Sequence, residues 1–154
     1  MAQAPILTGQ DIAEAQGAVT LLLERALEPT GVGRHAYVAL RVLVVRGPQA
    51  PRELHAYLAD QPQLGLSADA VAELLAGLEE DGHATGTAPD SPGPAQATPE
   101  GAALLARLNE AVAPATRALY AGLDPEELAV AHRVLLGVTQ RAGELAAQAA
   151  PGAS

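Results

Sequence analysis

The chain has to build its core almost entirely from leucine, valine and alanine. Its 154 residues include no phenylalanine, no tryptophan and only three tyrosines. Side chains of this size favour helices that pack closely through small residues. The length is enough for one domain with a substantial core. We therefore expect a single, mainly α-helical domain over residues 1–154.

The absence of cysteine excludes several kinds of protein. Without cysteine the chain has no disulfide framework, no thiolate zinc site and no cysteine nucleophile. The apolar runs are short and interrupted by arginine, and the N-terminus lacks the basic-then-apolar order of a signal peptide. We expect a cytoplasmic protein with no membrane segment.

Capping signals and apolar periodicity place the helices of the N-terminal half. Thr8 and Asp11 have the spacing of a capping box, which predicts a helix over about residues 9–28. Residues 34–46 are rich in valine, as a strand would be, but their length favours a buried helix, which is our prediction. Pro51 stands where the first turn of a short third helix tolerates proline. Ser67 is the expected N-cap of a fourth helix that Gly82 closes.

The C-terminal half predicts a hairpin and two long helices. Residues 85–97 are rich in Gly, Pro, Ser and Asp and indicate a hairpin with a loop at its tip. A long helix should begin at Thr98, kink at Pro114 and end near residue 122. Asp124 caps the last helix, whose apolar seam from Leu128 to Leu145 suits either pairing with a second helix or packing within its own monomer.

This order of elements, with its local motifs, resembles the MarR family of winged-helix regulators. The matching segments are Pro-Arg-Glu-Leu at 51–54, Leu-Gly-Leu-Ser-Ala-Asp-Ala-Val at 64–71, Leu-Glu-Glu-Asp-Gly at 78–82, Ala-Thr-Pro-Glu-Gly at 97–101 and Leu-Asp-Pro-Glu-Glu-Leu at 123–128. Together they span roughly residues 6–148. The resemblance implies six helices and a small β wing, with a winged helix-turn-helix lobe over 34–97 and dimerisation through the N- and C-terminal helices over 6–30 and 98–148.

The resemblance also implies partners and site residues, but no cofactor. A homodimer would read double-stranded operator DNA, with the fourth helix in the major groove and the wing near the minor groove. A small aromatic or phenolic ligand would release it, so we expect a repressor. The DNA-binding candidates are Arg52, Ser67, Asp69, Ala70, Glu73 and His83. The ligand-binding candidates are His35, Tyr37, Arg41 and Tyr120.

The charge distribution keeps a second hypothesis open. The net charge is −9, lysine is absent and the nine arginines are scattered. A helical wheel places Asp69, Glu73, Ala76 and Glu80 opposite the apolar face of the fourth helix, and Asp90 lies at the wing tip. Phosphate contacts need cations, and segments 67–81 and 84–100 contain none. The alternative is a degenerate family member that binds or transforms a small molecule without specific DNA binding.

No catalytic or metal-binding motif is present in the sequence. The four histidines are far apart, without the spacing of a zinc-binding helix, and no nucleophile elbow or phosphate loop occurs. We expect no metal site, and an enzyme is the less favoured reading. A single His, Tyr or Arg in a ligand pocket could still carry chemistry without leaving a motif.

Overall fold

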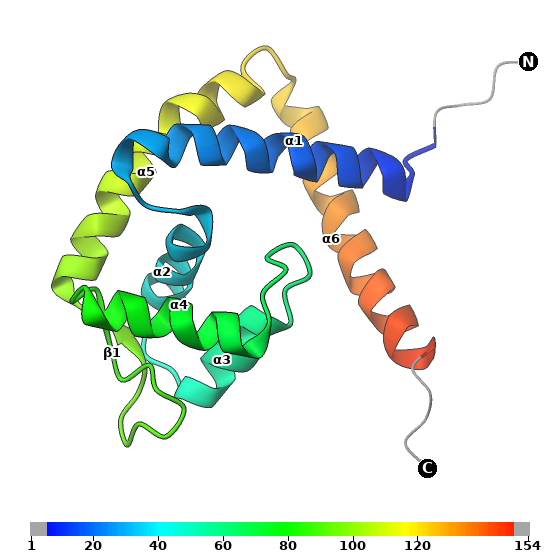
Figure 1. The fold of residues 1–154 in the computed structure, drawn as a ribbon. Helices are drawn as coiled ribbons and strands as arrows, with labels where there is room; N and C mark the ends of the chain where they lie inside the picture. Colours follow the sequence, from blue (N-terminus) through cyan, green and yellow to red (C-terminus); the bar gives the residue numbers. More distant parts are fainter. Residues whose placement is uncertain (1–5, 150–154) are drawn as a thin grey trace, which may run out of the picture. The chain divides into compact units, whose positions relative to one another are not determined.

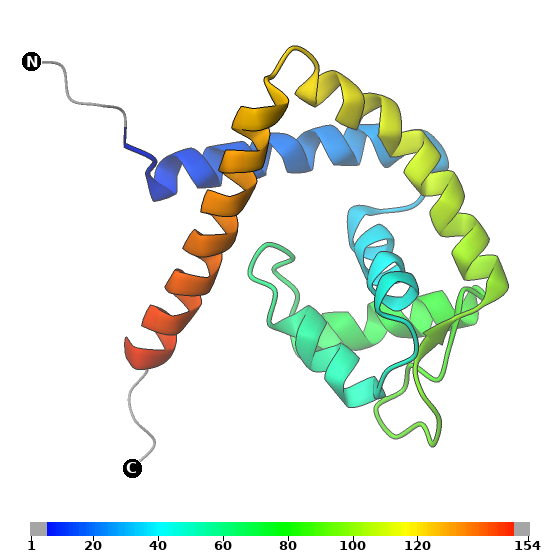
Figure 2. The ribbon, with the colours of Figure 1, turned by 180° about the vertical axis from the view of Figure 1, so that it is seen from behind.

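The structure is a computed structural model and describes residues 6–149 (Figures 1 and 2). It is mainly helical, as the composition predicts. The described elements are α1 (Gly9–Leu27), the short 3-10 helix η1 (Glu28–Thr30), α2 (Arg34–Arg46), α3 (Pro51–Ala59), α4 (Ala68–Glu80), β1 (Ala84–Thr85), β2 (Gln96–Ala97), α5 (Pro99–Tyr120) and α6 (Pro125–Ala149). Two compact units divide the chain, one extending to Thr116 and the other beginning at Arg117.

The predicted helix starts are confirmed by their hydrogen bonds. At the start of α1 the Thr8 hydroxyl accepts from the Asp11 amide at 3.2 Å, and the Asp11 carboxylate accepts from the Thr8 amide at 2.7 Å. This is the reciprocal capping box that the sequence indicates. At α4 the Ser67 hydroxyl accepts from the Ala70 amide at 3.1 Å. Both caps satisfy amides that the first helical turn leaves free.

Helix α2 is buried on two sides, which explains its ambiguous sequence. Ala39 and Leu43 belong to a cluster formed with α3, α4 and the wing, whereas Tyr37 and Leu40 belong to a second cluster formed with α1 and α5. A helix that packs on two sides carries apolar residues over a wide arc, and its valines are also residues that strands favour, so the sequence was compatible with either structure. The helical prediction for residues 34–46 is confirmed.

The wing is a short antiparallel hairpin braced by a third segment. Ala84 pairs with Ala97 and Thr85 with Gln96, which confirms the predicted hairpin with two-residue strands as its flanks. Gln49, in the connection between α2 and α3, exchanges backbone hydrogen bonds with Ala95 at 3.1 and 2.8 Å. The base of the wing is therefore joined to the chain that enters α3.

The junction between the wing and α5 gives a physical reason for the Thr-Pro-Glu-Gly motif. The Thr98 hydroxyl accepts from the Gly101 amide at 3.0 Å and donates to the carbonyl of Gly82 at 2.6 Å. Gly101 is buried against the carbonyl of His83, and a Cβ at this position would overlap that carbonyl. Only glycine allows the backbones to approach this closely.

The second unit contains the end of α5 and the whole of α6. Helix α5 continues through Pro114 and ends at Tyr120, and Gly122 follows at φ 80°. The predicted cap of α6 is confirmed, since the Asp124 carboxylate accepts from the Glu126 amide at 2.8 Å. None of the described helices combines the length and apolarity that crossing a bilayer requires.

Candidate nucleic-acid interface

Helix α4 has one face in the core and the other in solvent. Val71, Leu75 and Leu78 are buried among α2, α3 and the wing. The opposite positions, Asp69, Glu73, Ala76 and Glu80, are all exposed, as the helical wheel predicts. This geometry leaves a complete helix face available to a partner, and the face is acidic.

The predicted DNA-contact residues occupy different kinds of position around α4. Ser67 is exposed but its hydroxyl is engaged in the cap, and Ala70 is half-buried as the amide donor to that cap. His83 is half-buried, and its backbone accepts from Thr98 at 3.1 Å and donates to Leu78 at 2.8 Å. Asp69 and Glu73 point to solvent. The structure thus leaves carboxylates, rather than cations, as the free groups on this helix.

Arg52 is the one arginine or lysine in the sequence between residues 47 and 106. It is exposed in the first turn of α3, and its Nε donates to the carbonyl of Pro89 in the wing at 3.4 Å. Arg46, at the end of α2, stacks its guanidinium over the ring of Tyr57 at 4.3 Å from the centroid. A cation on an aromatic face keeps its charge and most of its donors free. Arg46, at the end of α2, and Arg52, at the start of α3, therefore keep charge free to meet phosphate.

A buried threonine joins the wing to both helices of the helix-turn-helix. Glu79 on α4 accepts from the hydroxyl of Thr87 at 2.5 Å, from its amide at 3.1 Å and from the amide of Gly86 at 3.3 Å. The bonds from Thr87 hold the pKa of Glu79 below its usual range. His55 on α3 lies 2.7 Å from the Thr87 carbonyl through Nε2. Because a carbonyl only accepts, Nε2 must carry the hydrogen.

Sequence reasoning did not single out His55, Glu79 or Thr87. Glu79 stands in the Leu-Glu-Glu-Asp-Gly motif, which could have drawn attention to it. Nothing local marks Thr87, since its partners lie 8 and 32 residues away in the chain.

The four predicted ligand residues have different surroundings, three in the first unit and Tyr120 in the second. His35 is half-buried, with Nε2 3.0 Å from the carbonyl of Leu64, which ties α2 to the turn before α4. The buried Tyr37 donates from its hydroxyl to Asn109 on α5 at 2.9 Å. Arg41 is exposed. Tyr120 belongs to the second unit, where it lines a shallow hollow with Leu128 and His132.

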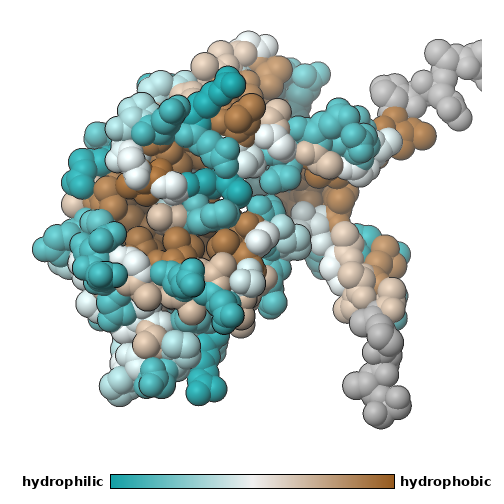
Figure 3. Space-filling view, in the orientation of Figure 1, coloured by the Kyte–Doolittle hydropathy of each residue, from teal (hydrophilic) through white to brown (hydrophobic). Residues whose placement is uncertain are grey.

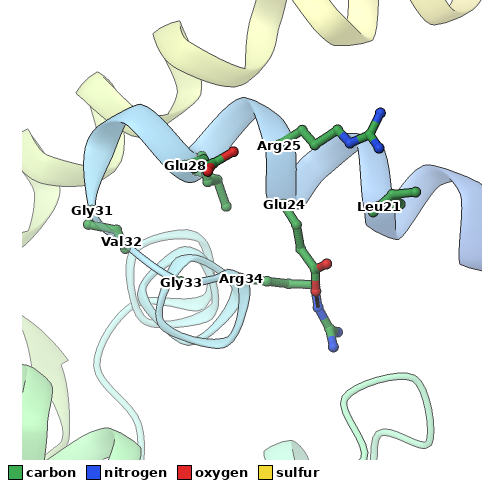
Figure 4. A pocket seen from close by; sticks show the side chains of 9 residues that line it. Leu21, Glu24, Arg25, Glu28, Gly31, Val32, Gly33 and Arg34 are labelled. Carbon is green, nitrogen blue, oxygen red and sulfur yellow. Dashed lines mark hydrogen bonds and ion pairs between the residues drawn. The ribbon is translucent and has the colours of Figure 1, made fainter.

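A larger hollow lies where α1 and η1 lead into α2 (Figure 4). It has a volume of 550 Å³. Figure 4 shows the side chains of Glu24 and Arg34 pointing toward each other below α1, and their ion pair measures 3.2 Å. Arg34 also donates to the carbonyl of Gln63 at 3.3 Å. The lining residues are Leu21, Glu24, Arg25, Leu27, Glu28, Gly31, Val32, Gly33 and Arg34. None of the predicted ligand residues is among them, so the sequence analysis missed this hollow.

Over residues 6–149, no three histidine or carboxylate side chains gather in a way that could hold a metal ion.

Solved structures share this frame over most of the chain. The transcriptional regulator PA3341 superposes with a TM-score of 0.72 at 25% identity, covering 88% of this chain and 98% of that one. Wild-type MarR from E. coli gives a TM-score of 0.67 at 21% identity, with coverage of 88% and 98%. The chain has the MarR winged-helix fold. The predicted fold class of six helices with a small wing is therefore confirmed.

A third similar structure is a complex. The MarR-family protein Rv2887 of Mycobacterium tuberculosis, solved with DNA, gives a TM-score of 0.64 at 25% identity, covering 88% of this chain and 98% of that one. The same mycobacterial protein has also been solved with salicylic acid. These neighbours of the MarR fold are transcriptional regulators. No protein-family model matches the sequence, and a comparison with curated protein sequences finds no match.

Proposed function

We propose that the chain is a cytoplasmic, ligand-responsive transcriptional regulator of MarR type that binds operator DNA as a homodimer, most simply as a repressor. The observation that carries this proposal is the exposed face of α4, framed by its cap at Ser67 and by the wing. A helix held in this way is the element that winged-helix proteins place in the major groove. The DNA complex of the similar mycobacterial protein supports the assignment.

The exposed face of α4 carries carboxylates, which is unusual for a helix that binds DNA. Asp69 and Glu73 can accept hydrogen bonds from cytosine amino groups, which is the base contact that carboxylates make. The free amides at the N-terminus of α4, beside Ser67 and Ala70, can meet a phosphate. Arg52 supplies the positive charge, and His83 adds a polar group at the other end of α4. Each of these roles is a proposal for substitution experiments.

The acidic surface has a predictable consequence for affinity. Sequence-independent binding comes from neutralised phosphates and falls with salt in proportion to their number. With so few arginines on the lobe, binding should be weak without the correct sequence and should show a shallow salt dependence. Specificity would then come from base contacts more than from charge.

Dimerisation is supported by apolar surface on the terminal helices. In α6 the exposed fraction is 49% for Val130, 44% for Leu135 and 57% for Leu136, and Figure 3 shows apolar residues open to the surface along that helix. In α1, Val19 and Leu21 are 42% and 49% exposed. Exposed apolar surface of this kind, on either helix taken by itself, marks an interface more often than a free surface. The second copy of the chain is the occupant we propose for it.

The hollow beside α1 is our proposed ligand site. Its leucines and valine can bury an apolar ring, and Arg25 and Arg34 can meet an anionic group. A ligand carboxylate would compete with Glu24 for Arg34. A small aromatic acid therefore fits the chemistry, and salicylate is a suitable probe because the similar mycobacterial protein carries it. His35, Tyr37, Arg41 and Tyr120 stay as further candidates.

The second candidate function is small-molecule binding without specific DNA binding. The observation that favours it is the acidic face of α4, with Glu73 and Glu80 exposed and no arginine or lysine anywhere in the helix. A gel-shift titration with the DNA upstream of the chain's own gene separates the two candidates. The titration should be run at low and at moderate salt.

The expected result is a sequence-specific shift that weakens with salt. Arg52→Ala should weaken the shift and reduce the salt slope by about 1, because one phosphate contact is lost. Arg107→Ala removes one charge from an exposed position in α5 and serves as the matched control. Absence of any shift at low salt rejects the DNA-binding proposal. A thermal shift with salicylate in that case favours the second candidate.

A further inference from the structure

Thr87 is the one polar side chain that the structure buries almost completely within residues 6–149, at 2% exposure. A buried hydroxyl costs stability unless it is hydrogen-bonded, so its partners are part of the reason for its position. Those partners come from two different helices. This places Thr87 at the point where the wing meets α3 and α4.

The contact with α4 is the stronger of the two. The Thr87 hydroxyl has one hydrogen, which lies between the Glu79 carboxylate at 2.5 Å and the Leu75 carbonyl at 3.4 Å. The charge and the shorter distance favour Glu79. The amides of Gly86 and Thr87 also donate to the two carboxylate oxygens. The Glu79 side chain of α4 thus accepts three hydrogen bonds from the wing.

Other contacts hold different parts of the wing. Gly86 has φ 68°, and a Cβ there would overlap the carbonyl of Pro94 across the loop. Arg52 bonds to Pro89 further along the loop. These contacts shape the loop of the wing, whereas the Glu79 carboxylate binds that loop to α4.

We propose that Glu79 is a positioning residue that holds the wing on the recognition helix, so that α4 and the wing meet DNA as one rigid element. This proposal rests on the proposed function. The wing has no arginine or lysine, so it gains no affinity from phosphate neutralisation. Its contribution must come from being held in place before binding, which lowers the entropy that binding would otherwise cost.

The contact has a defined pH dependence. Its bonds are complete above the ordinary pKa of a glutamate and are lost as the pH falls through the lowered pKa of Glu79. The titratable group that lines the same hollow as Glu79 and Thr87 is His55 from α3, and Glu80 is the acidic neighbour of Glu79 on α4.

Amide exchange in the full-length protein tests the contact without DNA. Glu79→Ala should make the amides of Gly86 and Thr87 exchange roughly tenfold faster, while the amide of Leu75 in α4 keeps its protection. Glu80→Ala removes the same charge one residue away and should leave the wing unchanged. In the unmodified protein, the amide resonance of Thr87 should shift as Glu79 titrates, and Glu79→Gln should abolish that shift. Equal exchange in the two alanine variants would overturn the proposal.

DNA binding tests the functional part, and the sign of the effect is decisive. On charge alone, removing either glutamate from an acidic surface should strengthen binding. We expect Glu80→Ala to bind more tightly than the unmodified protein, and Glu79→Ala to bind several-fold more weakly. Tighter binding by Glu79→Ala would overturn the positioning role. If the unmodified protein binds no DNA, the proposed function fails, and the exchange measurements alone decide whether Glu79 holds the wing.

Discussion

Gly101 is the position where one added methyl group should be most damaging. A Cβ there would overlap the carbonyl oxygen of His83 and lie 2.9 Å from the carbonyl carbon, whereas real Cβ contacts stay beyond 3.0 Å. Both partners are backbone, so neither can move aside as a flexible side chain would. The connection between the wing and α5 must therefore open by a distance on the order of an ångström.

The cost can be estimated from the contacts that this opening would disturb. Thr98 donates to the carbonyls of His83 at 3.1 Å and Gly82 at 2.6 Å, and each weakened bond costs about 1 kcal/mol. Overpacking adds about 1–3 kcal/mol. Alanine is the better helix former, which offsets about 1 kcal/mol at most. Gly101→Ala should thus lower the free energy of unfolding by about 3 kcal/mol, and the midpoint temperature by roughly 6–12 °C.

A second helical glycine provides the control. Gly77 in α4 has no atom within 4 Å of where its Cβ would lie, so Gly77→Ala should raise the stability by about 0.5–1 kcal/mol. Thermal unfolding followed by far-UV circular dichroism measures both variants, at one protein concentration because dimers unfold concentration-dependently. The same substitution should have opposite signs at the two positions. If Gly101→Ala melts at or above the temperature of the unmodified protein, the close approach is wrong.

Three further predictions concern the core, a helix cap and the oligomer. Leu54 is fully buried in the cluster shared with α2 and α4, so Leu54→Ala should lower the free energy of unfolding by about 2–5 kcal/mol. Val45 is 74% exposed, and Val45→Ala should lower it by less than about 0.5 kcal/mol; urea unfolding measures both. The bonds to Thr8 lower the pKa of Asp11, so the cap is complete above the ordinary aspartate pKa and is lost as the pH falls through the lowered pKa. Asp11→Asn should therefore reduce the loss of thermal stability that the unmodified protein shows at acid pH. Size-exclusion chromatography at micromolar concentration should give a dimer that Leu135→Asp dissociates, and a monomeric unmodified protein would contradict the proposed interface.

Most of the secondary structure could be predicted from local signals in the sequence. The caps at Thr8, Ser67 and Asp124 were predictable because each joins residues no more than three apart. The exposed face of α4 was predictable because helical periodicity assigns faces without reference to a partner. Residues 34–46 were harder, since their valines favour a strand and only the length of the run favours a helix.

The candidate site was only partly predictable. Arg52 could be predicted as a phosphate contact because it is the one arginine or lysine between residues 47 and 106. The hollow formed where α1 leads into α2 could not, because it depends on how η1 turns the chain and on the ion pair between Glu24 and Arg34 across that turn. The hydrogen bond between Tyr37 and Asn109 joins residues 72 positions apart, and no local sequence pattern predicts it.

By itself the sequence determined the helices, their caps, the hairpin and the acidic character of the lobe, because these follow from composition and from neighbours within about one helical turn. Tertiary structure alone decided that Thr87 is buried between α3 and α4, that Glu79 holds the wing and that Gly101 must lack a side chain. These features arise where segments distant in the chain are packed together, and their hydrogen bonds and close approaches exist only once the core has formed.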